Sequence, residues 1–126
     1  MEHEKRALAK NLARFRKQMG LTQAEISDAL EIERSRYAHY EKDTTPTVEL
    51  LIKISNILHV TLDELMRSPE EMRKVAESDG SRIEALFLTD LKKDEKQLVL
   101  RYRMLSDYDK KDLFSQLEQL LDRAQQ

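Results

Sequence analysis

Four polar side chains lie between residues 34 and 39, and their hydrogen-bonding groups suit the edges of nucleic-acid bases. They are Arg34, Ser35, Arg36 and His39. An arginine can donate two hydrogen bonds to O6 and N7 of guanine, which is worth roughly 1–3 kcal/mol against a wrong base. A helix through this segment would present its first turn and outward side together. We therefore expect base contacts from Arg34, Ser35 and His39, with Arg36 near the same face.

A short helix and a tight turn must come before these side chains to position them. Thr22 is placed to cap a helix, and Glu25, three residues on, completes a capping box. Ile26 and Leu30 give this helix a buried side. We expect a turn at residues 31–32.

The next helix, expected over residues 33–42, would bury Tyr37 and Tyr40 and expose the polar side chains. Two short helices joined by a tight turn make a helix-turn-helix. In that arrangement the second helix enters the major groove of DNA, so residues 33–42 are the expected recognition helix.

Three further helices would complete a compact bundle. The first runs to about residue 19 and is stopped by Gly20 at a C-cap position. A fourth starts at Pro46-Thr47, and a fifth, over residues 62–66, is capped by Thr61. Only 2 Gly and 2 Pro in 126 residues also favour helix over long loops. The sequence therefore predicts an all-α fold.

Several motifs recur in an order typical of one family. They are Leu12-x-x-x-Arg16, Gly20-Leu21-Thr22-Gln23, Glu25-Ile26, Tyr40-Glu41, Pro46-Thr47 and Val60-Thr61-Leu62-Asp63-Glu64-Leu65. Over residues 8–66 the chain resembles the lambda-repressor/Cro-type (Xre-like) helix-turn-helix family. The resemblance implies a five-helix DNA-binding domain in which the positions of Arg34, Ser35 and His39 read bases.

Phosphate contacts are expected around this helix. Gln23 resembles the family glutamine that anchors a phosphate at a helix N-terminus, where the helix dipole favours an anion. We also assign phosphate contacts to Thr22, Lys17, Lys42 and Thr44.

The resemblance also gives structural roles. It implies an ion pair between Arg16 and Glu41 that ties the first helix to the recognition helix. Glu31 and Asp43 stand where the family often has glycine. If the backbone at Glu31 has a positive φ, that residue costs about 1 kcal/mol.

Overall charge does not favour a nucleic-acid partner, but local charge does. The formal net charge is −2, whereas residues 5–17 hold six basic residues and no acidic one. Phosphate attraction depends on the local field, so one basic face is enough, and binding should weaken as salt is added.

Other classes of protein find little support. The absence of Cys excludes disulfides and thiolate chemistry. His3, His39 and His59 are not spaced as metal ligands, and no nucleophile motif, glycine-rich phosphate loop or cofactor motif is present. With no signal-peptide or membrane-spanning segment, we expect a soluble cytoplasmic protein that is not an enzyme and needs no metal or cofactor.

The second half of the chain has a different character. We predict a DNA-binding domain over residues 1–67, a helical linker over residues 68–81 and a C-terminal helical segment over residues 82–126. Asp79-Gly80-Ser81 makes the boundary. Residues 82–91 are apolar and fit either a helix or a strand.

The C-terminal segment carries leucine-rich helical stripes that must be covered. The residues assigned to dimerisation are Leu98, Tyr102, Leu105, Leu113, Phe114, Leu117, Leu120 and Leu121. A second copy, the chain's own N-terminal bundle or a partner protein could cover them. We expect a dimeric transcription regulator, more specifically a repressor on an inverted-repeat operator. The alternative is an antitoxin-like or protein-interaction module whose C-terminal helices bind a partner.

Overall fold

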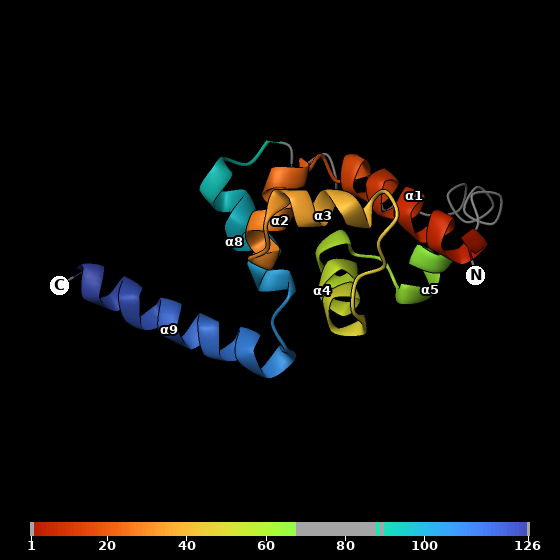
Figure 1. The fold of residues 1–126 in the computed structure, drawn as a ribbon. Coiled ribbons are helices and arrows are strands. Elements are labelled where there is room, and N and C mark those ends of the chain that lie inside the picture. The colour runs from red at the N-terminus through yellow and green to blue at the C-terminus, as the bar shows by residue number, and fades with distance from the viewer. Residues whose placement is uncertain (1, 68–87, 89, 126) are drawn as a thin grey trace.

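The computed structural model describes residues 2–67, 88 and 90–125 (Figure 1). These residues form seven helices: α1 (Glu2–Gln18), α2 (Gln23–Leu30), α3 (Arg34–Tyr40), α4 (Val48–Leu58), α5 (Leu62–Met66), α8 (Lys93–Arg103) and α9 (Asp107–Gln125). None of the described residues is in a strand. The all-α prediction is confirmed. The predicted linker, 68–81, and most of 82–91 lie outside the described residues, although Leu88 is helical.

The core of the bundle is formed by one buried side chain or more from each of α1 to α5. Leu12, Ile26, Tyr37, Ile54 and Leu65 are all fully buried in one cluster. Helical spacing of apolar residues puts each of these side chains on the inward face of its helix. The two helices of the predicted helix-turn-helix, α2 and α3, therefore pack on the same hydrophobic core as the other helices of the bundle.

The predicted helix starts are confirmed by their caps. The Thr22 hydroxyl accepts from Glu25 N at 3.1 Å, while a Glu25 carboxylate oxygen accepts from Thr22 N at 2.9 Å. Thr61 and Glu64 form a second capping box at α5. A reciprocal pair of this kind satisfies backbone N–H groups that a helix start leaves without partners.

The turn between α2 and α3 adopts the left-handed conformation. Glu31 has φ 59° and ψ 42°, and its N–H donates to Asp28 O at 3.1 Å. The strain considered at this position is therefore present, at about 1 kcal/mol. His59 also has a positive φ, 56°, where it ends α4. Asp43 does not, so the loop after α3 is built without a left-handed residue there.

Helix α3, the predicted recognition helix, is shorter than expected. Glu33 is its N-cap and Glu41 its C-cap, so α3 covers residues 34–40 rather than 33–42. The N–H groups of Lys42, Asp43 and Thr44 all donate to the carbonyl of His39. This convergence on one carbonyl replaces the regular helical pattern and turns the chain towards α4.

Helix α8 packs on the N-terminal bundle, against α2 and α4. Its Leu100 is fully buried in the same hydrophobic cluster as the side chains of α1 to α5, and Leu88 is buried there too. Burying one leucine is worth roughly 1.5–3 kcal/mol. The predicted boundary at residue 82 groups α8 with α9, whereas the structure joins α8 to the bundle.

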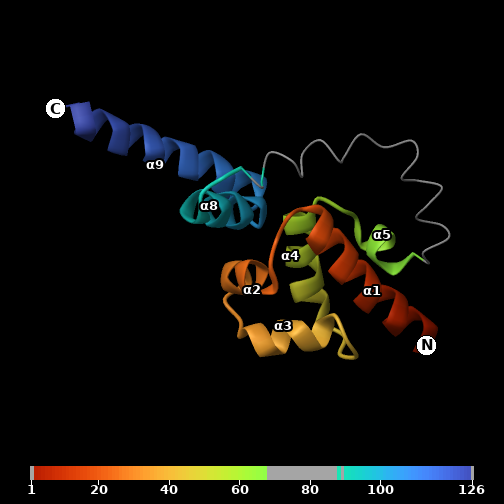
Figure 2. The same ribbon diagram turned by 90° about the horizontal axis from the view of Figure 1, so that it is seen from above.

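Helix α9 extends away from the bundle. None of its residues is buried within the single described chain. Its start is capped by the Ser106 hydroxyl, which accepts from Asp109 N at 3.1 Å. Figure 2 places α3 and α9 at opposite edges of the molecule. The exposed faces of α9 are therefore remote from α3.

Candidate nucleic-acid interface

The outer face of α3 presents the residues predicted to contact bases. Arg34, Ser35 and His39 are exposed, whereas Tyr37 and Tyr40 on the opposite side are buried. The two tyrosine rings meet edge to face, with centroids 6.3 Å apart. Burial raises the pKa of the Tyr37 hydroxyl far above its ordinary value, so this residue stays neutral in the core. The buried rings thus fix which side of α3 faces outward.

Two of the four predicted base-contacting residues have a polar neighbour four residues further along the chain. Arg36 Nε donates to the Tyr40 hydroxyl at 2.8 Å, which holds this guanidinium at the edge of the exposed face. His39 Nδ1 lies 3.8 Å from a carboxylate oxygen of Asp43, and both side chains are exposed. Arg36 is therefore set apart from Arg34 and Ser35, although it remains exposed to solvent.

The predicted phosphate-contacting residues fall into two groups. Lys17 and Lys42 are exposed. The others already make contacts within the chain: the Thr22 hydroxyl caps α2, Gln23 Nε2 donates to Glu41 Oε1 at 3.1 Å, and the Thr44 hydroxyl donates to Asp43 Oδ1 at 3.1 Å. A contact of Gln23 with phosphate would use the second amide hydrogen or a changed rotamer.

Arg16 and Glu41 form the ion pair that the family resemblance implies. Arg16 Nε lies 2.6 Å from Glu41 Oε2, and Nη2 lies 3.0 Å from Oε1. The two side chains are only 10% and 7% exposed. Arg16 Nη1 also donates to Leu21 O at 2.8 Å. The bidentate pair thus links the end of α1, the entry to α2 and the C-cap of α3.

The roles of Gln23 and Leu21 in this network are not indicated by any spacing in the sequence. Gln23 fills one lone pair of Glu41 from the side of α2. From the C-cap of α3, the same carboxylate therefore contacts groups of both α1 and α2. This makes Glu41 the residue that fixes how α1, α2 and α3 meet.

Two carboxylates make the stability of this domain depend on pH. Burial alone would raise the pKa of the Glu41 carboxyl, but its hydrogen bonds, first of all with Arg16, outweigh burial and lower that pKa. Burial also opposes ionisation of Glu25, whose pKa is nevertheless lowered by the Thr22 backbone N–H and by Lys96. Both groups are therefore easier to protonate in the unfolded chain than in the folded one.

The free energy of unfolding should accordingly fall as pH drops below 4.5, the ordinary value for these carboxyls, and keep falling through their lowered folded pKa values. Urea unfolding between neutral pH and pH about 3 measures this dependence. Glu41→Gln cannot ionise at this position and should show a flatter dependence than the wild type. Equal dependence in both proteins would show that Glu41 does not contribute to it.

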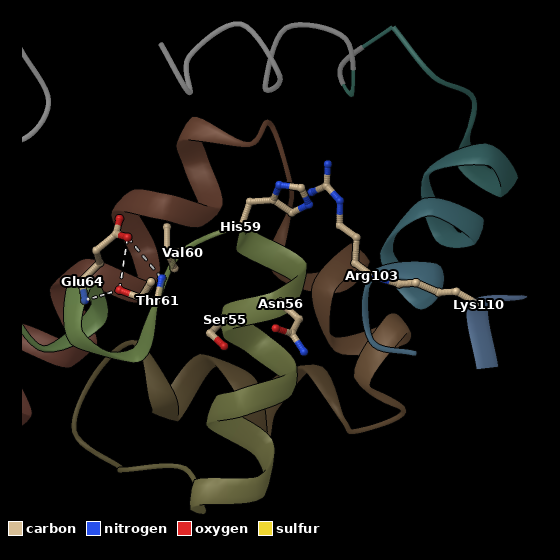
Figure 3. Close-up of a pocket in the computed structure, with 8 residues that line it drawn as sticks. All are labelled: Ser55, Asn56, His59, Val60, Thr61, Glu64, Arg103 and Lys110. Atoms are coloured by element: carbon tan, nitrogen blue, oxygen red, sulfur yellow. Dashed lines mark hydrogen bonds between the residues drawn. The ribbon is translucent and has the colours of Figure 1, made fainter. Parts of the chain in front are cut away.

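A polar pocket of about 340 Å³ lies on another part of the bundle (Figure 3). Ser55, Asn56, His59, Val60, Thr61 and Glu64 line it from α4 and α5, and Arg103 and Lys110 from α8 and α9. Arg103 Nη1 donates to Ile57 O at 2.8 Å, near the C-terminus of α4. Lys110 Nζ lies 5.0 Å from the centre of the Tyr102 ring. The pocket thus marks where the α8–α9 junction meets the domain.

Over the described ranges, no group of three or more His, Asp or Glu side chains could hold a metal ion. Among the helices of this part of the chain, none is both long and apolar enough to cross a membrane.

Comparison with known proteins identifies the class of this domain. Residues 12–65, from α1 through most of α5, match the family model described as "Helix-turn-helix". This part of the chain therefore matches the helix-turn-helix family, and the resemblance inferred from its motifs is confirmed.

Three relatives are similar to part of this chain. The chain is 40% identical over 76 residues to "Uncharacterized HTH-type transcriptional regulator YqaE" of Bacillus subtilis, covering 60% of this chain and 65% of that protein. It is 34% identical over 69 residues to "HTH-type transcriptional regulator ImmR" of the same organism, covering 54% of each. It is 37% identical over 59 residues to "Cryptic phage CTXphi transcriptional repressor RstR" of Vibrio cholerae, covering 46% and 53%. The matches thus span between about half and two thirds of each relative. No solved structure matches the chain.

Proposed function

We propose that this protein is a sequence-specific DNA-binding transcription regulator that represses from an inverted-repeat operator, which it binds as a dimer. The observation that carries the proposal is the outer face of α3. There Arg34, Ser35 and His39 are exposed while Tyr37 and Tyr40 anchor the helix from the other side. The relatives named as transcription regulators, one of them as a repressor, support the same function.

The proposed roles follow from the chemistry of each side chain. Arg34, Ser35 and His39 read base edges in the major groove, and Arg36 contributes from the edge of the face. Lys17 and Lys42 supply charge to the phosphates, and Gln23, Thr22 and Thr44 supply hydrogen bonds. Repression follows from occupation of a promoter, which requires no further contact with the transcription machinery.

Helix α9 is the proposed dimer contact. Its apolar stripe consists of Leu113, Phe114, Leu117, Leu120 and Leu121, of which the last four are between 39% and 62% exposed. The helix is about 28 Å long at 1.5 Å per residue, long enough for a paired contact. Leu98 on α8 is exposed as well, whereas Tyr102, Leu105 and Leu113 are half-buried. Because α3 and α9 lie at opposite edges of the molecule in Figure 2, we expect a partner on α9 to leave α3 free for DNA.

Charges beside the stripe favour a second copy of this chain as the partner. Asp109 lies seven residues before Gln116, and Arg123 lies seven residues after it, so both flank the same edge of the stripe. Both side chains are exposed. In an antiparallel pair of α9 helices that cross at Gln116, Asp109 of each copy faces Arg123 of the other. Such self-complementarity is what a twofold interface requires.

Reversing one of these charges should weaken the dimer. Arg123→Asp opposes Asp109 with a like charge at two symmetric places, so we expect the dimer dissociation constant to rise about threefold to tenfold. The double variant Asp109→Arg/Arg123→Asp should restore it. Light scattering over a dilution series measures the constant, and Lys93→Asp on α8 controls for the change in net charge. If the double variant stays as weak as the single one, the antiparallel self-pairing is wrong.

Selection of bound duplexes from a random pool tests the function as a whole. The full chain at a fixed salt concentration should enrich a palindromic sequence whose half-sites lie about 34 Å, or one DNA turn, apart. Light scattering on the same sample should give a dimer mass. Failure to enrich any sequence would overturn operator binding. A monomer mass in the presence of specific binding would favour a partner protein on α9, as in the antitoxin-like alternative.

A further inference from the structure

Helix α8 lies beside α2 in both views of the fold, although about 60 residues separate them in the sequence (Figures 1 and 2). Leu100 of α8 is fully buried and anchors this helix in the core. Polar side chains of α8 then reach α2 at both of its ends and along its length. Three residues make these contacts: Lys96, Gln97 and Arg101.

At the start of α2, Lys96 bonds the carboxylate that caps the helix. Lys96 Nζ lies 3.1 Å from Glu25 Oε2, and these side chains are both 14% exposed. Glu25 Oε1 is the oxygen that accepts from Thr22 N. Lys96 Nζ also donates to Gly20 O at 3.3 Å. One ammonium group therefore connects the end of α1, through Gly20, with the capping box of α2.

Gln97 and Arg101 of α8 bond backbone carbonyl groups in the first and last turns of α2. Gln97 Nε2 donates to Glu25 O at 2.9 Å. Arg101 Nη2 donates to Asp28 O at 3.0 Å, in the last turn of α2, and Arg101 Nη1 lies 3.4 Å from Glu31 Oε1. Glu31 is the left-handed residue that sends the chain into α3. Arg101 thus contacts both the last turn of α2 and the residue at which the turn begins.

We infer that Lys96, Gln97 and Arg101 are positioning residues for DNA recognition, because they set the pose of α2 and of its turn into α3. The inference rests on the proposed DNA-binding function and gives the C-terminal half a role in it besides dimerisation. The two ends of α2 that α8 holds are the ones that matter for DNA. Gln23, at the first, is a proposed phosphate contact, and Glu31, at the second, determines the direction in which Arg34 is presented.

The contacts of Arg101 are suited to positioning more than to stability. The Arg101–Glu31 pair is largely exposed, and an exposed ion pair contributes little to stability. Its donors are nevertheless directed at fixed backbone and carboxylate acceptors around one turn. A small rotation of α2 shifts every residue of α3 that follows, and recognition of base edges is sensitive to displacements on the scale of a hydrogen bond.

The test compares three full-length proteins on a single half-site taken from the selected operator. The double variant Lys96→Met/Arg101→Met removes the polar heads and keeps apolar side chains of similar length. Lys93→Met removes a charge from an exposed position on the same helix and serves as the control. The quantity measured is the ratio of affinity for the cognate half-site to affinity for a scrambled duplex, well below the melting temperature.

We expect this ratio to fall about threefold to thirtyfold in the double variant and to stay unchanged in Lys93→Met. The dimer mass of the double variant should also be unchanged, because α9 is intact. Restoring charge at one position, as in Lys96→Arg/Arg101→Met, should recover part of the loss. If the double variant does not fold, Arg101→Met alone carries the test, since its contacts are the more exposed.

An unchanged ratio in a folded variant would overturn the positioning role and leave the proposed function intact. A wild-type chain with no cognate half-site would overturn the proposed function itself, and the inference with it. The two failures are therefore distinguishable, because the first is seen in the variant alone and the second in the wild type.

Discussion

Replacing Glu41 with alanine is expected to lower the free energy of unfolding by about 3–5 kcal/mol. The change leaves the Arg16 guanidinium without its bidentate partner in a place where the side chain is only 10% exposed. Removing one member of a buried pair costs more than the pair itself contributes, since the remaining charge stays buried without compensation. Gln23 loses its acceptor at the same time.

Thermal unfolding followed by circular dichroism measures this loss. At about 4–8 °C per kcal/mol for a domain of this size, the melting temperature should fall by more than 10 °C. Asp43→Ala is the matched control, because it removes a nearby carboxylate that is 70% exposed, and it should shift the melting temperature little. An apolar double variant, Arg16→Met/Glu41→Leu, should be less destabilised than Glu41→Ala. A melting temperature unchanged in Glu41→Ala would show that the pair does not hold the three helices.

Local chemistry is the part of this fold that the sequence predicts well. Thr22 with Glu25 and Thr61 with Glu64 form the capping boxes expected from their spacing of three residues. A cap depends on neighbours in the chain, so the spacing alone determines it. The left-handed conformation of Glu31 is only a conditional expectation, because the sequence does not have the glycine that usually indicates a positive φ at such a turn.

The packing of α8 could not be predicted in the same way. Its periodicity offers the stripe of Leu98, Tyr102 and Leu105, but Leu98 is 60% exposed, and the residue that enters the core is Leu100. Helical spacing indicates a candidate apolar face without indicating which element covers it. The polar residues Lys96 and Arg101 decide the orientation, and their acceptors are backbone groups about 70 residues away in the chain.

The residues proposed to read bases were predictable as an exposed set, but the differences among them were not. Arg34 and Arg36 are two residues apart, and both could contact a base. In the structure both side chains are exposed, but Arg36 Nε donates a hydrogen bond to the Tyr40 hydroxyl. The side chains of residues two apart point to different sides of a helix. Only the packing of the core decides which of the two points fully outward. This difference makes Arg34 the sharper position at which to test recognition.

Arg34→Ala is expected to reduce affinity for the selected operator about fivefold to 150-fold per half-site, the range for losing one bidentate base contact. Affinity for a scrambled duplex should change much less, because non-specific binding comes from phosphate contacts. The preference at one base pair of each half-site should relax, while preferences elsewhere in the operator stay. Repeating the duplex selection with the variant reveals this pattern directly.

A second variant with the same loss of charge separates base reading from general attraction. Lys17→Ala, at a proposed phosphate contact, should weaken cognate and scrambled duplexes alike and reduce the slope of log affinity against log salt by about 0.9. Lys111→Ala on α9, across the molecule from α3, should leave both unchanged (Figure 2). If Arg34→Ala behaved like Lys17→Ala, with a uniform loss and no relaxed base preference, Arg34 would be a phosphate contact. The reading face of α3 would then have to centre on Ser35 and His39.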